Sequence, residues 1–290
     1  MQGLRSHHWT EQSCEIGECI YCGQREGVLS DEHSIPFGLN GPWVLRHASC
    51  DSCAKITSRF ERDVMRCLWP DVRNVLAMKS RRKEKRSPSI PLEIHENGQQ
   101  RIVLIPRTEF PTYLTAPIFP PPACYWSNRP VNGVFANMES IHLSRPTFRE
   151  ASKEFPGADF IGAHANFSPE AFARMLAKIG YYTAVAVIGI KAFTTTRIRN
   201  IILATDPCIG HWVGSWWKES INEHPNGGLH QIKIVHSQPG NEIHAMIRLF
   251  ARFGAPEYHV MLGPADPTYV ASDAWPLQWR DAKPEDLLYV

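Results

Sequence analysis

Residues 19–53, "CIYCGQREGVLSDEHSIPFGLNGPWVLRHASCDSC", decide the fold of the N-terminal part of this chain, because a cysteine pair stands at each end of the stretch. Cys19-x-x-Cys22 and Cys50-x-x-Cys53 can each chelate a metal ion from a tight turn. Together they supply four thiolates, the tetrahedral set that Zn²⁺ takes in structural sites. The spacing therefore predicts a structural zinc site, and the alternative is four buried, reduced cysteines.

The other cysteines do not extend this pattern. The chain has eight cysteines, and in an intracellular protein such a number favours metal binding over disulfides. Cys14 is a competing candidate ligand for the same ion. Cys67, Cys124 and Cys208 have no partner at ligand spacing, and we expect them in the hydrophobic core.

The stretch between the two pairs contains Asp31, Glu32 and His33. A zinc ion held by four thiolates keeps no open coordination position, so it is not the expected catalyst. Carboxylate and phosphate oxygens suit Mg²⁺ or Mn²⁺, and an imidazole can take a proton from water near neutral pH. This combination indicates hydrolysis of a phosphodiester bond, with the metal stabilising the charge that develops on the phosphate.

Basic residues are concentrated directly after the second cysteine pair. The whole chain of 290 residues has a net charge of only +2, but residues 54–86 contain 11 Lys and Arg against 4 Asp and Glu. Such a local excess favours a polyanionic partner, here nucleic acid. The alternative is a solvated helix followed by a flexible linker. The candidate phosphate-binding residues are Lys55, Arg59, Arg62 and Arg66.

The combined pattern C-I-Y-C-G, D-E-H-S-I-P-F-G-L, A-S-C-D-S-C and F-E resembles the HNH endonucleases, in the group that contains cysteine pairs. The resemblance covers about residues 19–66, under a fifth of the chain. It implies a small ββα-metal fold stapled by zinc on the four cysteines. It also implies that His33 is the general base, that Glu32 binds the catalytic Mg²⁺ or Mn²⁺, and that Asp31 is an alternative ligand or supports the ligand.

The sequence departs from this family in two places. Ala54 stands where many members have Asn or His, and the last His or Asn of the family, on the helix, is missing. Glu61 could supply the missing ligand as a carboxylate, and Thr57, one turn before it, could bind metal or a phosphate oxygen. The alternative is that Glu61 forms salt bridges with basic neighbours on a solvated face.

Beyond this module the pattern predicts an α+β fold, with a domain boundary near residue 86. Residues 1–86 would form the zinc-stapled module with its basic helix and linker, and residues 87–290 a larger α+β domain with an antiparallel sheet. The apolar spacing Ile56, Phe60, Val64 and Leu68 predicts a helix that Pro70 ends or bends. The other expected elements are a hairpin around Asn97-Gly98, a helix from Ser168 to Gly189, and strands in "HQIKIVHS", "EIHAMIRLFARF" and "EYHVMLG".

The expected location is the cytoplasm, with no membrane association. The first 17 residues have no apolar segment typical of a signal peptide, and the longest apolar run, "YYTAVAVIGI", is too short to span a bilayer. For residues 87–290 three roles remain open: target selection, ligand sensing, and formation of a homo-oligomer.

The sequence thus predicts a metal-dependent HNH endonuclease that hydrolyses phosphodiester bonds, with DNA as the substrate that the resemblance implies. Defence against foreign DNA would fit a nuclease fused to a sensor-like domain. The alternative is a zinc-stapled nucleic-acid-binding or scaffolding protein without catalysis, which Ala54 favours. A third alternative places an unrelated enzyme in the C-terminal domain.

Overall fold

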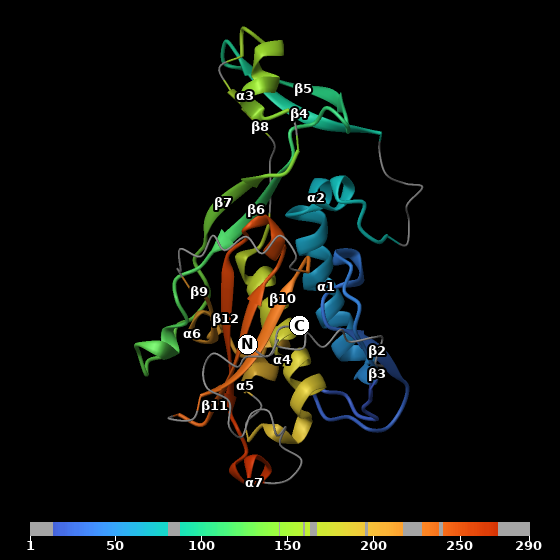
Figure 1. The fold of residues 1–290 in the computed structure, drawn as a ribbon, viewed down its shortest axis with the longest axis vertical. Helices are drawn as coiled ribbons and strands as arrows, with labels where there is room; N and C mark the ends of the chain where they lie inside the picture. Colours follow the sequence, from blue (N-terminus) through green and yellow to red (C-terminus); the bar gives the residue numbers. More distant parts are fainter. Residues whose placement is uncertain are drawn as a thin grey trace, which may run out of the picture.

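The computed structural model describes residues 14–80, 88–144, 146–158, 160–162, 167–194, 197–216, 228–237 and 240–271. Over these residues the chain is a mixed α+β structure, as expected, and its strands form several small sheets (Figure 1). Most of the basic linker, at 81–87, lies outside the described residues, and so does the side chain of the candidate ligand Cys14.

The N-terminal module, residues 14–80, combines a three-stranded sheet with two helices. The sheet has the order β1-β3-β2, in which β2 is antiparallel to β3 and β1 is parallel to it. Helix α1 follows β3 without a loop, so the end of the strand and the first turn of the helix carry the second cysteine pair. The elements are β1 (Cys14–Glu15), β2 (Leu29–His33), η1 (Phe37–Leu39), β3 (Val44–Cys50), α1 (Asp51–Cys67) and α2 (Pro70–Val75).

Helix α1 is confirmed, with one change in its buried face. Phe60 and Val64 are buried as expected, but Ile56 is 38% exposed. Cys53 and Thr57 take its place in the buried stripe, because they lie two turns and one turn before Phe60 on the same side of the helix. The helix is therefore anchored to the core partly by its zinc-ligand candidate.

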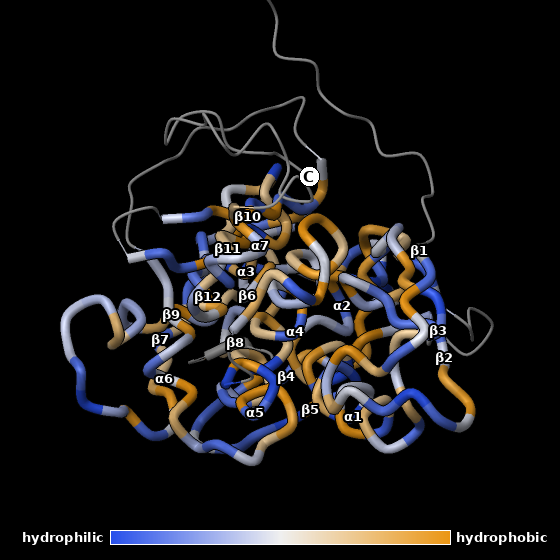
Figure 2. The backbone as a smooth tube through the Cα atoms, turned by 90° about the horizontal axis from the view of Figure 1, so that it is seen from below, coloured by the Kyte–Doolittle hydropathy of each residue, from blue (hydrophilic) through white to orange (hydrophobic). Residues whose placement is uncertain are grey.

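Helix α4 (Pro169–Ile188) runs through the centre of the molecule, between the N-terminal module and a four-stranded sheet (Figures 1 and 2). It begins as expected: the Ser168 hydroxyl accepts a hydrogen bond from the amide of Ala171 at 3.2 Å, and Pro169 occupies the first turn. Gly189 ends it with a positive φ of 84°. Among the described helices α4 alone is long and apolar enough to cross a membrane, but 78% of its most apolar window is buried in the protein, as in a core helix.

The four-stranded sheet that packs on α4 is antiparallel throughout, with the order β10-β11-β12-β9, and it confirms the three strands expected near the end of the chain. The helix lies so close to the sheet that a Cβ on Gly180 would come within 2.8 Å of the Cβ of Ala245. The strands are β9 (Val213–Trp216), β10 (Gln231–Ser237), β11 (Glu242–Arg248) and β12 (Glu257–Pro264), and the short helices around them are α5 (Arg197–Ile202), α6 (Ile209–Trp212) and α7 (Pro267–Val270).

A separate lobe, at the top of Figure 1, contains the expected hairpin. Asn97 and Gly98 both have positive φ, 52° and 74°, as a two-residue hairpin turn requires. The hairpin β6–β7 leads from the lobe back to the body. The elements are β4 (Ser89–Glu96), β5 (Gln99–Pro106), β8 (Phe160–Gly162), β6 (Tyr113–Ile118), β7 (Asn137–His142) and α3 (Phe148–Ala151).

One continuous hydrophobic core joins the N-terminal module to α4 and its sheet. At the junction the Trp69 ring meets the rings of Phe172 and Phe250 edge-on, with centroids 5.5 and 4.9 Å away. The lobe has a small core of its own, built from Ile90, Leu92 and Phe110. The module is thus packed into the C-terminal part of the chain rather than tethered to it.

The three unpaired cysteines are not core residues. Cys67, at the end of α1, is exposed, and Cys124 and Cys208 are only partly buried. Their expected placement in the core was wrong: Cys67 ends α1, Cys124 lies in the short 3-10 helix Ala123–Tyr125, and Cys208 directly precedes α6.

Candidate metal centre and acidic-histidine site

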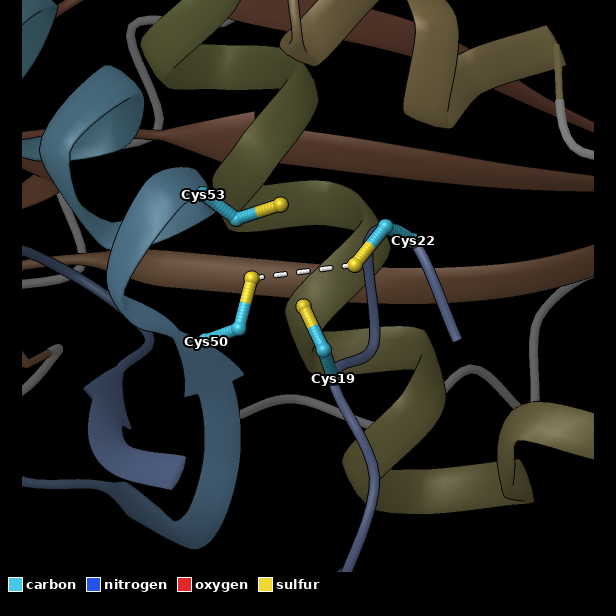
Figure 3. Close-up of side chains that lie close together, drawn as sticks. All are labelled: Cys19, Cys22, Cys50 and Cys53. Carbon is cyan, nitrogen blue, oxygen red and sulfur yellow. Dashed lines mark hydrogen bonds between the residues drawn. The ribbon is translucent and has the colours of Figure 1, made fainter. Parts of the chain in front are cut away.

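The four sulfurs of Cys19, Cys22, Cys50 and Cys53 converge on one point (Figure 3). All four lie within 4.8 Å of one another, and the Sγ atoms of Cys22 and Cys50 are 3.7 Å apart. Three of the cysteines are buried, and only Cys22 is exposed. The pairs that the sequence separates by 27 residues are therefore brought into one cluster.

Local backbone geometry explains why the sulfurs converge. In the first pair the Gly23 amide donates to the Cys19 carbonyl at 2.8 Å, which closes a tight turn, and Gly23 adopts a φ of 77° that favours glycine. In the second pair Cys50 ends β3, and Cys53 lies in the first turn of α1. The first pair is thus held by a tight turn, and the second pair by the junction of β3 with α1.

This cluster fits a zinc ion. A tetrahedral site with zinc–sulfur distances of about 2.3 Å places its sulfurs about 3.8 Å apart, close to the distance between Cys22 and Cys50. Burial, followed by the charge of Cys19, raises the pKa of Cys53. Four ionised thiolates would therefore repel one another at this site without a cation, and a bound metal ion supplies the compensating charge.

Strand β2 directs its acidic residues to opposite sides. The pairing of β2 with β3 is irregular between Ser30 and Glu32, and this bulge sends Asp31 to the surface and Glu32 into the interior. Asp31 accepts a hydrogen bond from the His47 amide at 3.3 Å. Glu32 is only 7% exposed. Asp31 and Glu32 therefore do not converge on one ion.

His33 ends β2 next to the buried acid. The residue is partly exposed, although its ring Nδ1 is buried, and the centroid of its ring lies 6.0 Å from that of Phe37. The position at a strand end, beside an acid and within reach of solvent, is one that a general base needs.

Lys178 of α4 lies between the two acids that the sequence suggested as metal ligands. Its ammonium group is fully buried, 2.9 Å from Glu32 Oε1 and 2.7 Å from Glu61 Oε1. It also donates to the backbone carbonyls of His33 and Ser34. The structure thus brings Glu32 and Glu61 together, as expected for two ligands of one cation, but the cation between them is a lysine.

Electrostatics around Lys178 are dominated by burial and by these ion pairs. Burial alone would lower the pKa of Lys178, but the charges of Glu32 and Glu61 and their hydrogen bonds outweigh it and leave the pKa raised. Burial, together with the charge of Glu32, raises the pKa of Glu61 against the opposing charge of Lys178. The ammonium group therefore stays charged, and it neutralises carboxylates that would otherwise repel each other.

The residues around Glu32 and Glu61 do not fit Mg²⁺ or Mn²⁺ in this arrangement. Mg²⁺ requires near-octahedral oxygen ligands at about 2.1 Å, and the space between these carboxylates is filled by the nitrogen of Lys178. Thr57 is buried in α1, and its hydroxyl donates to the Ala54 carbonyl at 3.3 Å; no contact of its hydroxyl with Glu32 or Glu61 is found among the described residues. A second cation beside the ammonium group would also be repelled at low dielectric.

Two residues near the acids were not predicted from the sequence. Lys178 gave a signal, as a charged residue inside the apolar run "ARMLAKIGYY", since a lysine within a buried helix needs an ionic partner. Tyr21, between the cysteines of the first pair, gave none. Its hydroxyl is buried close enough to Glu32 and Glu61 that their charges raise its pKa, after the larger effect of burial.

The basic residues of α1 form an exposed stripe opposite the buried face. Lys55, Arg59, Arg62 and Arg66 follow the spacing i, i+4, i+7 and i+11, so they share one side of the helix. Lys55 is paired with Asp51 at 2.5 Å. Among the described residues no carboxylate pairs with the three arginines, so they present their charge to solvent.

Comparison of the chain with protein-family models, with curated proteins and with solved structures finds no match.

Proposed function

We propose that the chain is an HNH-like nuclease that hydrolyses phosphodiester bonds in nucleic acid, with DNA as the expected substrate. The observation that carries the proposal is the position of His33 at the end of β2, directly after Glu32, which lies with Glu61 around Lys178. The four-cysteine cluster lies at the other end of the β2–β3 pair, where Cys50 is paired with Leu29. The resemblance of residues 19–66 to HNH endonucleases supports it.

In the proposed reaction His33 takes a proton from water as the water attacks phosphorus. The bond from phosphorus to the leaving sugar oxygen breaks, and that oxygen takes up a proton. A general base of this kind contributes typically 10²–10⁴-fold to the rate. The arginines of α1 would hold neighbouring phosphates, and zinc on the four cysteines would keep the strand and helix in place. No step is routed through a divalent ion between Glu32 and Glu61, because Lys178 fills that position.

A second function, nucleic-acid binding without cleavage, is favoured by the same lysine. If hydrolysis needs a divalent ion on Glu32 and Glu61, as the resemblance implies, a chain with Lys178 between these residues would keep the fold of the module but would not cleave phosphodiester bonds. Ala54, in the place of a usual Asn or His, points the same way.

Incubation of supercoiled plasmid with the zinc-loaded protein separates the two functions. The buffer contains Mg²⁺, Mn²⁺ or no added divalent ion, and His33→Ala is compared with His142→Ala, an exposed histidine of β7. The nuclease proposal predicts cleavage that falls at least about 100-fold in His33→Ala and is unchanged in His142→Ala. Equal cleavage by both variants would rule out His33 as the base, and a gel shift without cleavage by the wild type would favour binding alone.

A further inference from the structure

We infer that Lys178 is a built-in cation, which occupies the position between Glu32 and Glu61 in place of a divalent metal ion and fixes the strand end that carries His33. The role of Lys178 in positioning His33 for catalysis rests on the proposed function. Its role as the cation between Glu32 and Glu61 does not. The test of this inference does not require cleavage.

The first support is the number of acceptors around the ammonium group. An ammonium group has three N–H donors, and here four oxygens compete for them, from Glu32, Glu61 and the carbonyls of His33 and Ser34. The ring of Tyr182 lies on another side, with its centroid 5.8 Å from Nζ. The group is saturated, so it has no donor left for a phosphate and no space beside it for a metal ion.

The second support is the rigidity of the lysine. Lys178 lies in the middle of α4, a 20-residue helix, and its side chain is 0% exposed. Its neighbours Ala177 and Ile179 are also fully buried. The side chain therefore has no route by which it could swing into solvent and leave the two carboxylates to a metal ion without disruption of the core.

The third support is that the same nitrogen reaches both sides of the candidate site. Glu32 and His33 belong to β2, Glu61 belongs to α1, and Lys178 belongs to α4. In HNH-like chemistry a divalent ion would tie the strand to the helix; here the ammonium group ties both of them to the C-terminal part of the chain. The carbonyl of His33 is one of its acceptors, so the lysine acts on the orientation of the base through the backbone.

Mn²⁺ binding tests the inference directly. The zinc-loaded full-length protein is freed of other divalent ions with a chelating resin, and free Mn²⁺ is followed by electron paramagnetic resonance as it is titrated to millimolar concentration. The proteins to be titrated are the wild type, Glu32→Gln, Lys178→Met and Lys178→Met/Glu32→Gln. The matched control is Lys153→Met, which removes an exposed lysine.

We expect no Mn²⁺ uptake by the wild type or Lys153→Met, about one ion per chain for Lys178→Met, and no such ion in the double variant. The melting temperature of Lys178→Met should rise on addition of Mn²⁺, whereas that of the wild type should not change.

Mn²⁺ uptake by the wild type that Glu32→Gln abolishes would overturn the inference, and so would a folded Lys178→Met that takes up no Mn²⁺. Should Lys178→Met fail to fold, the comparison of the wild type with Glu32→Gln decides alone. Absence of plasmid cleavage would count against the proposed nuclease, but it would leave this result intact.

Discussion

Lys178 is a single buried charge on which the arrangement of Glu32, Glu61 and the end of β2 depends. Two carboxylates that are largely shielded from water at one site are costly unless a cation compensates them. Glu32 and Glu61, whose side chains are 8% and 14% exposed, receive that cation from a helix more than a hundred residues away in sequence. A buried ion pair adds little stability compared with apolar packing, but removal of one partner is expensive because the other charge remains. The lysine is thus essential once the acids are present.

Replacement of Lys178 by methionine, in the absence of added divalent ion, should lower the free energy of unfolding by about 3–5 kcal/mol, because it leaves the buried Glu32 and the partly buried Glu61 without their cation. Urea denaturation followed by circular dichroism measures this change. Lys153→Met, at an exposed position, should change stability by less than about 0.5 kcal/mol. A decrease of less than about 1 kcal/mol for Lys178→Met would show that the ion pairs are not as buried as described.

The residues of the candidate site were only partly predictable from the sequence. The four cysteines could be assigned to one cluster, since the spacing of each pair fixes a chelating turn. The approach of Glu61 to Glu32 was expected from the helix that follows the second pair. That a lysine would lie between them could not be known, because helical periodicity says which face of α4 is buried but not which distant strand that face will meet.

Among the elements, helix α1 has a buried face that packs in the core and an exposed face that is basic. One face carries Cys53, Thr57, Phe60 and Val64 into the core, and the other carries the basic stripe into solvent. Since the helix begins at the second cysteine pair, the zinc ion that we expect there would also fix the direction of the stripe. We therefore expect the affinity for nucleic acid to depend on the positive charges of the basic stripe of α1.

Replacement of Arg59, Arg62 and Arg66 together by glutamine should weaken nucleic-acid binding and flatten its salt dependence. The slope of log affinity against log salt should fall in magnitude by about 0.9 for each phosphate that α1 no longer neutralises. Fluorescence anisotropy with a labelled duplex at several salt concentrations gives this slope. Arg129→Gln, which removes an exposed arginine elsewhere, is the control. An unchanged slope in the triple variant would exclude α1 as the nucleic-acid-binding surface.

Local signals predicted the elements that they mark and missed those that depend on distant partners. Ser168, Pro169 and Gly189 marked the ends of α4, and Asn97-Gly98 marked the turn of the β4–β5 hairpin. The hairpin β6–β7 lies in a proline-rich region and was not predicted, because its pattern does not alternate clearly. Ile56 was expected in the buried face of α1 but is 38% exposed, because apolar spacing alone does not reveal that Cys53 and Thr57 are buried.

At the scale of the whole molecule, the N-terminal module and the C-terminal part are held together by polar contacts as well as by the shared core. His230, which precedes β10, has its Nε2 2.8 Å from the carbonyl of Leu39 in the module, and its Nδ1 accepts from the amide of Phe250 at 3.2 Å. This arrangement requires a neutral ring with its proton on Nε2. Burial lowers the pKa of His230 to about 4.

Acid should therefore weaken the junction. The pKa of His230 in the folded protein lies below the ordinary value of 6.5, so the unfolded chain takes up its proton first as the pH falls. Well above pH 6.5 the titration of His230 does not change the free energy of unfolding. Between pH 6.5 and 4 it should lower that free energy by up to about 3 kcal/mol, at 1.36 kcal/mol per pH unit. The measurement is urea denaturation at a series of pH values.

The control for this pH dependence is His230→Gln, which can still donate to Leu39 but does not titrate. Its stability should fall less steeply than that of the wild type over this range. His244, whose pKa burial also lowers to about 4, contributes to both proteins equally, so the difference between them isolates His230. Parallel curves for the two proteins would contradict the described role of His230.

We propose that the N-terminal module depends above all on a zinc ion held by the four cysteines, and the metal content of the purified protein is the measurement that decides whether they hold it. Elemental analysis should find about one zinc ion per chain in the wild type and in Cys67→Ser, whose cysteine is exposed and outside the cluster. Cys50→Ser should release the zinc and, with it, more than about 4 kcal/mol of stability. A wild-type protein without zinc, or a Cys50→Ser variant that keeps it, would contradict the assignment of these cysteines as a zinc site.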